Sequence, residues 1–514
     1  VMVSTHPALV RMAAGLDMLL QFPHDCTEQR VSRARAQLAM SKFRDLLFLE
    51  DDKTSREQAI NETLKYLPTT LDGNGLCAYW PGGEGNVSLT AWVVQFLSEV
   101  RNGGYPINEK MYSRMLRGLE RSLRSDCHWL VDGFSWLERC WALIALTDAG
   151  RNTRSWSTEL ARKTQYLDAE AQANVVLAMA QGGDRATSVV SELTDELWKS
   201  LIFRLYQGKR MYGGFQENSL GGGAVILSSE TRALARLLRA LQKVAPSDKR
   251  LALLRQALIN LGQGNGWGST NANAEALTAL SECFHPDAFY GRRAKLVFTS
   301  KDKKEENELT EDSPTMQKVY KTADDVSVLL TSSDKDVVAR METSYIPAGD
   351  GSKVKARANG FALTRDFLRV AFDEKSSSWP ALERVKAPYV FEVGQTLEES
   401  ISVVNAEDRN YVAIVIPLAA GFEPLNPRLA TAPPEATPTG TITLKPTYAA
   451  YRDSHVAFYY DSLPKGTYKF VYRVRATTPG TFIQPAAWAE MMYQQSVRGN
   501  SNGASVKVMP ALKE

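Results

Sequence analysis

Residues 22–29 of this 514-residue chain read Phe-Pro-His-Asp-Cys-Thr-Glu-Gln. Cys26 and Gln29 are three positions apart, so a helix beginning here would place them about 5–6 Å apart at Cβ. At that distance the Cys26 sulfur can attack the Gln29 carboxamide, expel ammonia and leave an internal thioester. Such a bond is an acyl group with a good leaving group, and it predicts a site that reacts with a nucleophile.

The residues around this pair favour a helix start. Asp25 is the predicted N-cap, and Glu28, three residues later, would complete a capping box. Cys26 and Gln29 would then lie in the first turn, where the backbone N–H groups stabilise negative charge on an oxyanion or a departing thiolate. The alternative is a small buried cysteine with no chemistry.

Composition sets the frame for this prediction. The chain is long enough for two to four domains, with 44% hydrophobic residues, 23% charged residues and a net charge of +3. These values are ordinary for a globular protein and give no sign of nucleic-acid binding. Charged residues interrupt every apolar stretch, so no transmembrane span is expected. Because the chain opens at Val1 inside ordinary domain sequence, we expect a fragment whose targeting signal lies elsewhere.

The cysteine count also favours one functional thiol. An odd number of cysteines fits one reactive residue with the others buried. No pair has the spacing of metal ligands, and with only five histidines no zinc site and no cofactor are expected. The cysteines are Cys26, Cys77, Cys127, Cys140 and Cys283.

Residues 1–290 predict a repeated helical pattern. Turns rich in glycine and aromatic residues are each followed by an amphipathic segment, and the turns are centred on residues 72–75, 132–134, 212–215 and 264–268. The clearest helix follows the first turn, with Ser88 as its predicted N-cap and one apolar face. That face consists of Leu89, Trp92, Val93, Phe96, Leu97 and Val100. Helix pairs of this kind that close on themselves would form an α/α toroid.

After about residue 290 the pattern changes to short alternating runs, which predict antiparallel strands of a β-sandwich. A segment rich in Pro, Thr and Ala, residues 427–446, is expected to be a long loop. The predicted strands are residues 295–298, 326–330, 367–372, 389–393, 411–416, 455–460 and 468–474.

The sequence near the C-terminus resembles a known family. Residues 463–468 (Leu-Pro-Lys-Gly-Thr-Tyr), 473–482 and 489–493 resemble the last macroglobulin-like domain of the bacterial alpha-2-macroglobulins, in the thioester-containing alpha-2-macroglobulin and complement superfamily. The resemblance extends over the whole chain as the C-terminal portion of a larger protein. It implies a multidomain α + β fold: an α/α toroid thioester domain at 1–290, the returning half of a CUB-like β domain at 291–345, and a macroglobulin-like antiparallel β-sandwich at 346–514.

The resemblance implies a protease inhibitor and not an enzyme. In this family a protease cuts a bait region, which this chain lacks, and the thioester is then uncovered. A lysine of the protease attacks Gln29, Cys26 leaves, and the protease stays covalently bound. The isoglutamyl cysteine thioester Cys26–Gln29 is the reactive group.

The family also implies a lock that keeps water from the thioester, formed by an aromatic residue before the motif and a methionine of the last domain. By position these residues are Phe22 and Met492, although both could be plain core residues. Bacterial relatives usually read Pro-Tyr-Gly-Cys-Leu-Glu-Gln, so His24 and Asp25 depart from the pattern, and Phe22 lacks a tyrosine hydroxyl. His24 is a candidate base beside the thiol, or it points to solvent. With Asp25 and Glu28 it is a possible modulator.

The resemblance further implies a periplasmic setting, lipid anchoring of the full-length protein and a role in bacterial defence. Target proteases, and in some branches a peptidoglycan synthase, are the implied partners, and a monomer is expected. Two other classes stay open: a structural protein of the cell envelope with the same fold, and a toroid cyclase or prenyltransferase. The last needs an acidic cluster or a zinc site, and the sequence shows neither.

Overall fold

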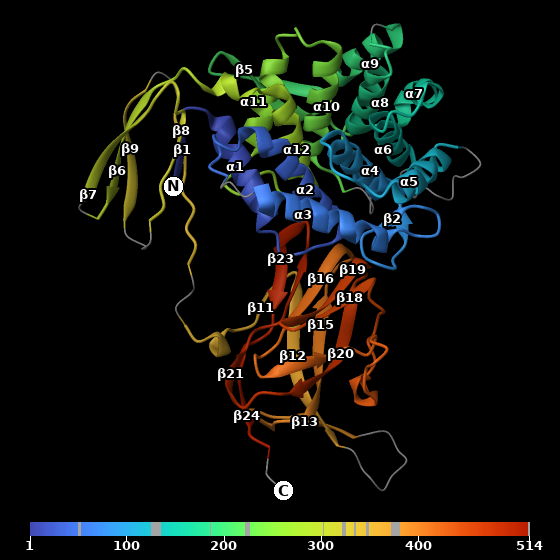
Figure 1. The fold of residues 1–514 in the computed structure, drawn as a ribbon, viewed down its shortest axis with the longest axis vertical. Coiled ribbons are helices and arrows are strands. Elements are labelled where there is room, and N and C mark those ends of the chain that lie inside the picture. Colours follow the sequence, from blue (N-terminus) through green and yellow to red (C-terminus); the bar gives the residue numbers. More distant parts are fainter. Residues whose placement is uncertain are drawn as a thin grey trace. The chain divides into compact units, whose positions relative to one another are not determined.

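The computed structural model describes residues 1–49, 53–124, 135–185, 187–221, 227–301, 303–320, 325–333, 336–345, 349–371 and 381–511. These residues form two compact units, Val1–Ser344 and Tyr345–Glu514. The first unit carries the helices together with small sheets, and the second consists almost entirely of strands (Figure 1). A mixed fold with mainly antiparallel sheets, as the sequence predicts, is therefore confirmed.

The helices of the first unit are short and follow one another closely. They are α1 (Pro7–Leu20), α2 (Thr27–Met40), α3 (Lys53–Tyr66), α4 (Val87–Asn102), α5 (Glu109–Ser122), α6 (Ser135–Asp148), α7 (Arg154–Ala161), α8 (Ala169–Gln181), α9 (Ser188–Lys199), α10 (Glu230–Val244), α11 (Leu251–Leu261) and α12 (Thr270–Cys283).

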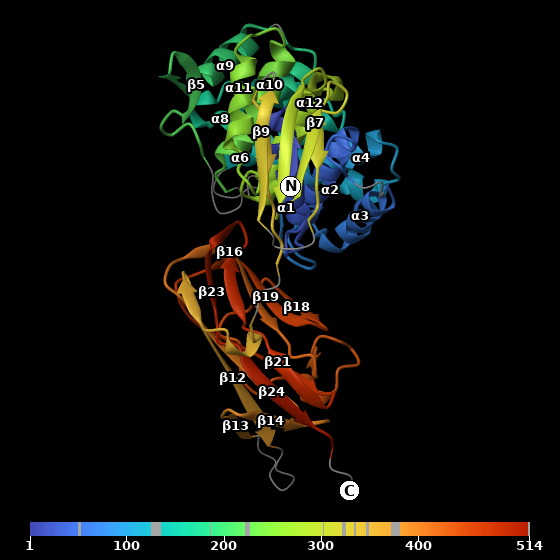
Figure 2. The ribbon, with the colours of Figure 1, turned by 90° about the vertical axis from the view of Figure 1, so that its left-hand side faces the viewer.

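The even-numbered helices pack against one another in chain order. α2 packs on α4, α4 on α6, α6 on α8, α8 on α10 and α10 on α12, and α12 returns to pack on α2. The odd-numbered helices cover this set from outside: α5 packs on α4 and α6, α7 on α6 and α8, and α1 on α12 and α2. This alternation brings α2, which begins at the predicted reactive pair, next to α12, the last helix of the unit (Figure 2).

α4 shows how the pattern produces the packing. Its six predicted core residues, from Leu89 to Val100, are all buried, so the predicted face is confirmed. The predicted N-cap is wrong. Asn86, not Ser88, caps the helix, because its side chain accepts a hydrogen bond from the backbone N–H of Leu89 at 2.9 Å. Ser88 lies in the first turn and donates its hydroxyl to Asn86 Oδ1 at 3.1 Å.

The first unit also holds small sheets. β1 (Met2–Ser4) lies between β10 (Val338–Arg340) and β8 (Thr315–Gln317), so the start of the chain pairs with residues more than 300 positions away. The sequence pattern gives no sign of this strand. A second sheet has the order β7 (Lys303–Leu309), β6 (Ala294–Ser300), β9 (Val326–Ser333), and a short pair joins β2 (Cys77–Ala78) to β3 (Gly85–Asn86).

One predicted turn is wrong. Residues 212–215 are not a turn, because they belong to β5 (Lys209–Phe215), which pairs with β4 (Leu201–Tyr206). The true turn is Gln207-Gly208, and both residues have positive φ, as a two-residue hairpin requires.

The second unit is built from two larger sheets and one small sheet. The six-stranded sheet has the order β11-β23-β22-β16-β19-β18, the five-stranded sheet β13-β12-β15-β20-β17, and the small sheet β14-β24-β21. Their bounds are β11 (Arg357–Asn359), β12 (Phe361–Ala371), β13 (Ala381–Val385), β14 (Tyr389–Glu392), β15 (Thr396–Asn405), β16 (Arg409–Pro417), β17 (Phe422–Leu425), β18 (Tyr448–Arg452), β19 (His455–Leu463), β20 (Gly466–Ala476), β21 (Gly480–Gln484), β22 (Trp488–Met491), β23 (Gln494–Asn500) and β24 (Ala504–Met509).

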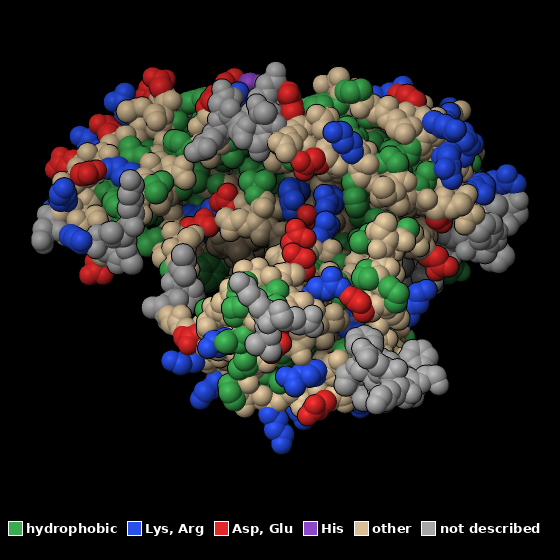
Figure 3. Space-filling view, turned by 60° about the horizontal axis from the view of Figure 1, so that its bottom comes forward, with side chains coloured by type: hydrophobic (Ala, Val, Ile, Leu, Met, Phe, Trp, Pro, Cys, Tyr) green, Lys and Arg blue, Asp and Glu red, His purple; other side chains and the backbone are tan. Residues whose placement is uncertain are grey.

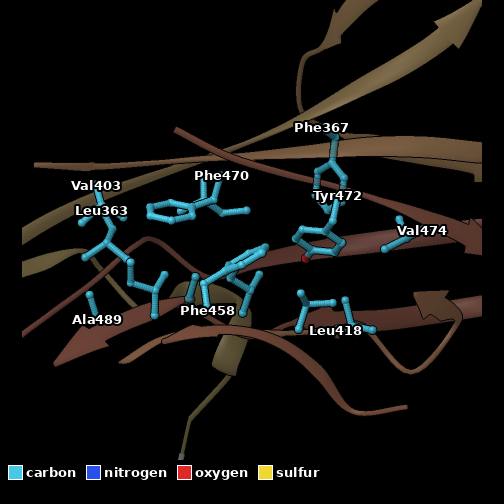
Figure 4. Packing of buried hydrophobic residues seen from close by; sticks show 14 of the residues in the cluster. Leu363, Phe367, Val403, Leu418, Phe458, Phe470, Tyr472, Val474 and Ala489 are labelled. Atoms are coloured by element: carbon cyan, nitrogen blue, oxygen red, sulfur yellow. The ribbon is translucent and has the colours of Figure 1, made fainter. Parts of the chain in front are cut away.

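The predicted strands of this unit are confirmed over the described residues, which leave out position 372, with one exception in pairing. β14 pairs with β24 in parallel, so the unit is not wholly antiparallel. Apolar side chains of the larger sheets form a single buried core, in which Phe458 and Phe470 lie with ring centroids 5.2 Å apart (Figure 4). Residues 427–446 contain no strand, which agrees with the predicted loop.

The surface carries charges of both signs. Lysine, arginine, aspartate and glutamate side chains are interspersed on the face in Figure 3, as the small net charge predicts. Within the described ranges, no helix is both long enough and apolar enough to cross a membrane.

Candidate functional site

The start of α2 places Cys26 and Gln29 against each other. Cys26 is the N-cap of the helix, with φ −67° and ψ 169°, and Gln29 is the third helical residue. The two form a capping box, in which the backbone N–H of Cys26 donates to Gln29 Oε1 at 3.1 Å. Both side chains are buried. The helix that the sequence predicts is confirmed, but the capping box is one residue later than predicted.

Asp25 does not cap α2 because its carboxylate is held elsewhere. Arg30 and Arg33, one turn apart on α2, reach back to it at 3.2 and 3.0 Å. The Asp25 side chain is half-exposed, so these ion pairs fix the loop and contribute little net stability.

The same two arginines tie down the loop before Cys26. Arg33 Nε donates to the Leu19 carbonyl at 3.1 Å, and its Nη2 to the Phe22 carbonyl at 3.3 Å. Arg30 Nε donates to the Asp25 carbonyl at 2.9 Å. The loop is therefore fastened to the helix that follows it, and this limits how far Cys26 can move from Gln29.

Thr27 anchors the first turn from the other side. Its hydroxyl lies 2.7 Å from the Ala78 carbonyl and 2.9 Å from the Tyr79 carbonyl, and its backbone N–H donates to Tyr79 at 2.9 Å. Thr27, the first residue after the N-cap, is thus fixed to the segment that contains β2.

Glu28 connects α2 to α12 instead of completing a capping box. Its Oε1 accepts from the Ser32 hydroxyl at 2.5 Å, and its Oε2 from the Thr270 hydroxyl at 2.7 Å. Trp92 Nε1 of α4 also donates to the Ser32 hydroxyl at 3.2 Å. A buried carboxylate at the helix start therefore positions the pair through three helices.

The structure describes Phe22, His24 and Met492, the residues expected near the reactive pair, each within its own unit. The Phe22 and His24 rings meet edge to face, with centroids 5.9 Å apart, and His24 is 2% exposed, so it does not point to solvent. Met492 follows β22 in the other unit, where its N–H donates to the Tyr411 carbonyl at 2.8 Å. The lock between Phe22 and Met492 stays a prediction, as does a role for His24 as a base.

A buried charge network lies among the even-numbered helices. Glu275 of α12 accepts from Arg236 at 2.9 Å and Arg239 at 2.7 Å, both on α10, and lies 3.9 Å from Arg35 of α2. Burial opposes ionisation of Glu275, but the three guanidinium groups hold its pKa down to about 2. Gln95 of α4 joins the network by accepting from Arg236 Nη2 at 2.8 Å.

Sequence reasoning missed this network. Its members lie on helices far apart in the chain, and no local spacing brings them together. The signal that could have revealed them is an arginine or glutamate on the apolar face of a predicted helix, as at Arg236 between the buried Leu234 and Leu237.

The other described cysteines, Cys77, Cys140 and Cys283, all have raised pKa values. Burial raises the pKa of Cys77 to about 12 and that of Cys283 to about 12, and it raises the pKa of Cys140 further. A thiol with such a pKa stays protonated and unreactive at neutral pH. Cys127 lies outside the described residues. Among the described residues, no group of three His, Cys, Asp or Glu is placed to hold a metal ion.

Comparisons with known proteins identify the architecture. The second unit contains the Bacterial Alpha-2-macroglobulin MG10 domain, whose family model matches residues 360–496. An alpha-2-macroglobulin homolog of Nostoc is 24% identical over 368 residues, which are 68% of this chain and 18% of the relative.

Solved structures agree with this assignment. The crystal structure of Salmonella alpha-2-macroglobulin reacted with methylamine has a TM-score of 0.71 and 18% identity, and the match covers 99% of this chain and 31% of that one. Native Escherichia coli alpha-2-macroglobulin, solved from domain MG7 to the C-terminus, has a TM-score of 0.67 and 19% identity, covering 99% of this chain and 77% of that one.

The fold is that of a macroglobulin-like protein. The resemblance expected from the sequence is confirmed: residues 360–496 match a domain of the bacterial alpha-2-macroglobulins, and the fold of the chain is similar to theirs. It spans 18% of the length of the curated relative, so it holds a small part of that architecture.

Proposed function

We propose that Cys26 and Gln29 form an internal thioester in the folded protein. The observation that carries this proposal is the hydrogen bond from the Cys26 N–H to Gln29 Oε1. When the Cys26 sulfur attacks Gln29 Cδ, negative charge develops on Oε1, and this N–H donates to that atom. The C–N bond breaks, ammonia leaves, and the C–S bond remains.

The thioester would make this chain the reactive part of a broad-spectrum protease inhibitor. A lysine amine of the protease attacks Gln29 Cδ, an amide forms, and Cys26 leaves as a thiol. The protease is held covalently, and the protein is an inhibitor and not an enzyme. The Salmonella relative was solved after reaction with methylamine, which is an amine nucleophile of the same kind. Cleavage of a bait region elsewhere in the full-length protein would trigger exposure of the bond.

We further propose the domain roles that the resemblance implies. Residues 1–290 form an α/α toroid that carries the thioester, 291–345 the returning half of a CUB-like β domain, and 346–514 the C-terminal macroglobulin-like sandwich. The packing of α12 against α2 supports the toroid, because it closes the order of the even-numbered helices. The lock of Phe22 and Met492 would exclude water until triggering, since water would hydrolyse the bond.

The setting is proposed by the same resemblance. A periplasmic, lipid-anchored, monomeric protein would meet foreign proteases in bacterial defence, and a peptidoglycan synthase is a further proposed partner. The competing proposal is an envelope protein that keeps the fold and acts without covalent chemistry.

Substitution at Gln29 tests the inhibitor proposal. In the full-length protein, Gln29→Glu removes the amide from which ammonia leaves but keeps an oxygen that can accept from the Cys26 N–H. We expect wild type to form a covalent, denaturant-resistant adduct with an added protease, and the variant to form none. Equal retention of protease by both proteins, with no covalent adduct in either, would contradict covalent trapping and support the structural role.

A further inference from the structure

A groove of about 650 Å³ lies on the first unit, outside the region of Cys26 and Gln29. One wall is the turn of residues 73–75, another is a face of α5, and Trp156 of α7 stands at its side. The charged side chains lining it are Arg114, Arg117, Glu120, Arg121 and Arg124. Four arginines in one groove are the feature that requires an explanation.

The floor of the groove is tightly built. Gly118 of α5 faces the turn, and a Cβ there would lie 3.1 Å from the Gly75 carbonyl oxygen. Gly75 itself has φ +81°, and a Cβ on it would lie 2.7 Å from the Arg114 carbonyl oxygen. The two glycines therefore allow α5 to lie directly on the turn, and the groove has a fixed shape.

Two of the arginines hold this floor together. Arg114 Nη2 donates to the Asp72 carbonyl at 3.1 Å, and Arg121 Nη2 donates to the Asn74 carbonyl. A carbonyl oxygen carries no net charge, so each guanidinium keeps its full positive charge in the groove.

Arg117 stands between them and has a different role. It is exposed, and it makes no hydrogen bond or ion pair with any described residue. The carboxylate of the lining, Glu120, is paired with Arg151 at 3.3 Å. The lining therefore has an excess of positive charge, with a guanidinium fork open to a ligand.

We propose that this groove binds a phosphorylated saccharide with at least two phosphate groups. The planar guanidinium fork matches two phosphate oxygens at once, which favours phosphate as the anion. Arg114 and Arg121 are seven residues apart on α5, about 10 Å along the helix, so the groove matches anions set apart along a ligand. Trp156, half-buried at the side, offers a flat apolar face to a sugar ring between the phosphates.

Calorimetric titration of the 514-residue chain with fructose 1,6-bisphosphate at low salt tests this site. We expect saturable binding by wild type and none with unphosphorylated fructose. Arg117→Glu should weaken binding about tenfold or more, because it reverses the charge of the open fork. Trp156→Ala should weaken it about threefold.

Lys110→Glu is the matched control. Lys110 is exposed on the same helix but outside the groove, and the charge change is identical. Its affinity should stay within about twofold of wild type. Absence of saturable binding by wild type, or equal weakening by Lys110→Glu and Arg117→Glu, would overturn the proposal. Circular dichroism confirms that each variant is folded.

A second arm distinguishes a soluble ligand from a lipid headgroup with the same recognition chemistry, a polyhydroxylated ring that carries phosphates. Vesicles of phosphatidylcholine with phosphatidylinositol 4-phosphate are sedimented with wild type and with Arg117→Glu. Sedimentation of wild type that the variant loses assigns the site to a lipid headgroup. Binding of the bisphosphate without sedimentation assigns it to a soluble ligand.

Discussion

The backbone N–H of Cys26 donates to Oε1 of Gln29 at 3.1 Å across the first turn of α2. One contact thus performs two tasks. It caps the helix, and it holds the carboxamide that the Cys26 sulfur would attack beside an N–H donor for the resulting oxyanion.

The first prediction is that one substitution, Gln29→Glu, separates the role in capping from the role in the reaction. Gln29→Glu keeps an acceptor for the Cys26 N–H and adds negative charge near the helix start, where the dipole favours it. We expect its melting temperature to stay close to that of wild type while its reaction with amines is lost. Differential scanning calorimetry and labelling with a radioactive amine check the two halves. Loss of both folding and labelling would contradict the separation.

Thr27 supports the turn, and its removal should expose the proposed thioester. Thr27→Val keeps the shape but deletes the hydroxyl that lies between the Ala78 and Tyr79 carbonyls. The loss removes this donor from the Ala78 carbonyl, while the Tyr79 carbonyl keeps the backbone N–H of Thr27, and it should cost about 1–3 kcal/mol. Urea unfolding measures this, and spontaneous thiol release should become faster.

The control for Thr27 is Thr158→Val on α7, where an exposed hydroxyl donates to the Arg154 carbonyl at 2.9 Å. There water can replace the lost bond, so the change should be below about 0.5 kcal/mol. An equal loss at both positions would show that the anchoring bonds of Thr27 have no special role.

The charge network should stabilise the first unit as a whole. Glu275→Gln leaves Arg236, Arg239 and Arg35 buried without their shared carboxylate, which should cost about 3–5 kcal/mol. Glu282→Gln, which removes the half-exposed partner of Arg239, should cost below about 1 kcal/mol. Urea midpoints of both variants give the comparison, and similar values would contradict the role of Glu275.

The network also predicts acid sensitivity. The pKa of Glu275 is about 2 in the folded state, below the ordinary value of 4.5 for a glutamate. A carboxyl group whose pKa is lowered by folding stabilises the folded state at pH values above its ordinary pKa. This stabilisation is lost as pH falls toward 2. Wild type should therefore lose more stability than Glu275→Gln between these pH values, as fluorescence-detected unfolding would show.

Asp461 should have the opposite effect in the second unit. Burial raises its pKa from 3.8 to about 6, so the folded state favours the protonated form. The stability that depends on protonated Asp461 is fully present at pH values below the ordinary pKa, and it is lost as pH rises through about 6. Asp461→Asn should gain about 1–3 kcal/mol relative to wild type between about pH 4 and pH 7.

Urea midpoints at both pH values test Asp461. Asp453→Asn, in the exposed turn before β19, is the control and should show no such gain. A difference between Asp461→Asn and wild type that does not change with pH would contradict the prediction.

The sequence predicted elements better than it predicted their ends. The apolar spacing of α4 and the alternation of β16 and β20 were sufficient, because burial on one face dictates those periods. The caps were misplaced at Asp25 and Ser88. In each case a neighbouring residue caps the helix instead: Asn86 caps α4, and Cys26 caps α2 while ion pairs with Arg30 and Arg33 of α2 hold the Asp25 carboxylate.

The candidate site followed the same division. Cys26 and Gln29 could be singled out because their relationship is local, three residues apart on one helix turn. The anchor of Thr27 on Tyr79, the link from Glu28 to Thr270 and the network around Glu275 join residues that are far apart in the chain. No spacing rule brings such residues together before the fold is known.

The intact mass of the native, full-length protein, with and without methylamine, tests the thioester most directly. We predict a mass lower than the sequence requires by one ammonia. Methylamine should then add once, at Gln29, as a single new thiol appears at Cys26. A protein of unmodified mass, with Gln29 still an amide and Cys26 open to thiol reagents before any amine is added, would contradict the thioester.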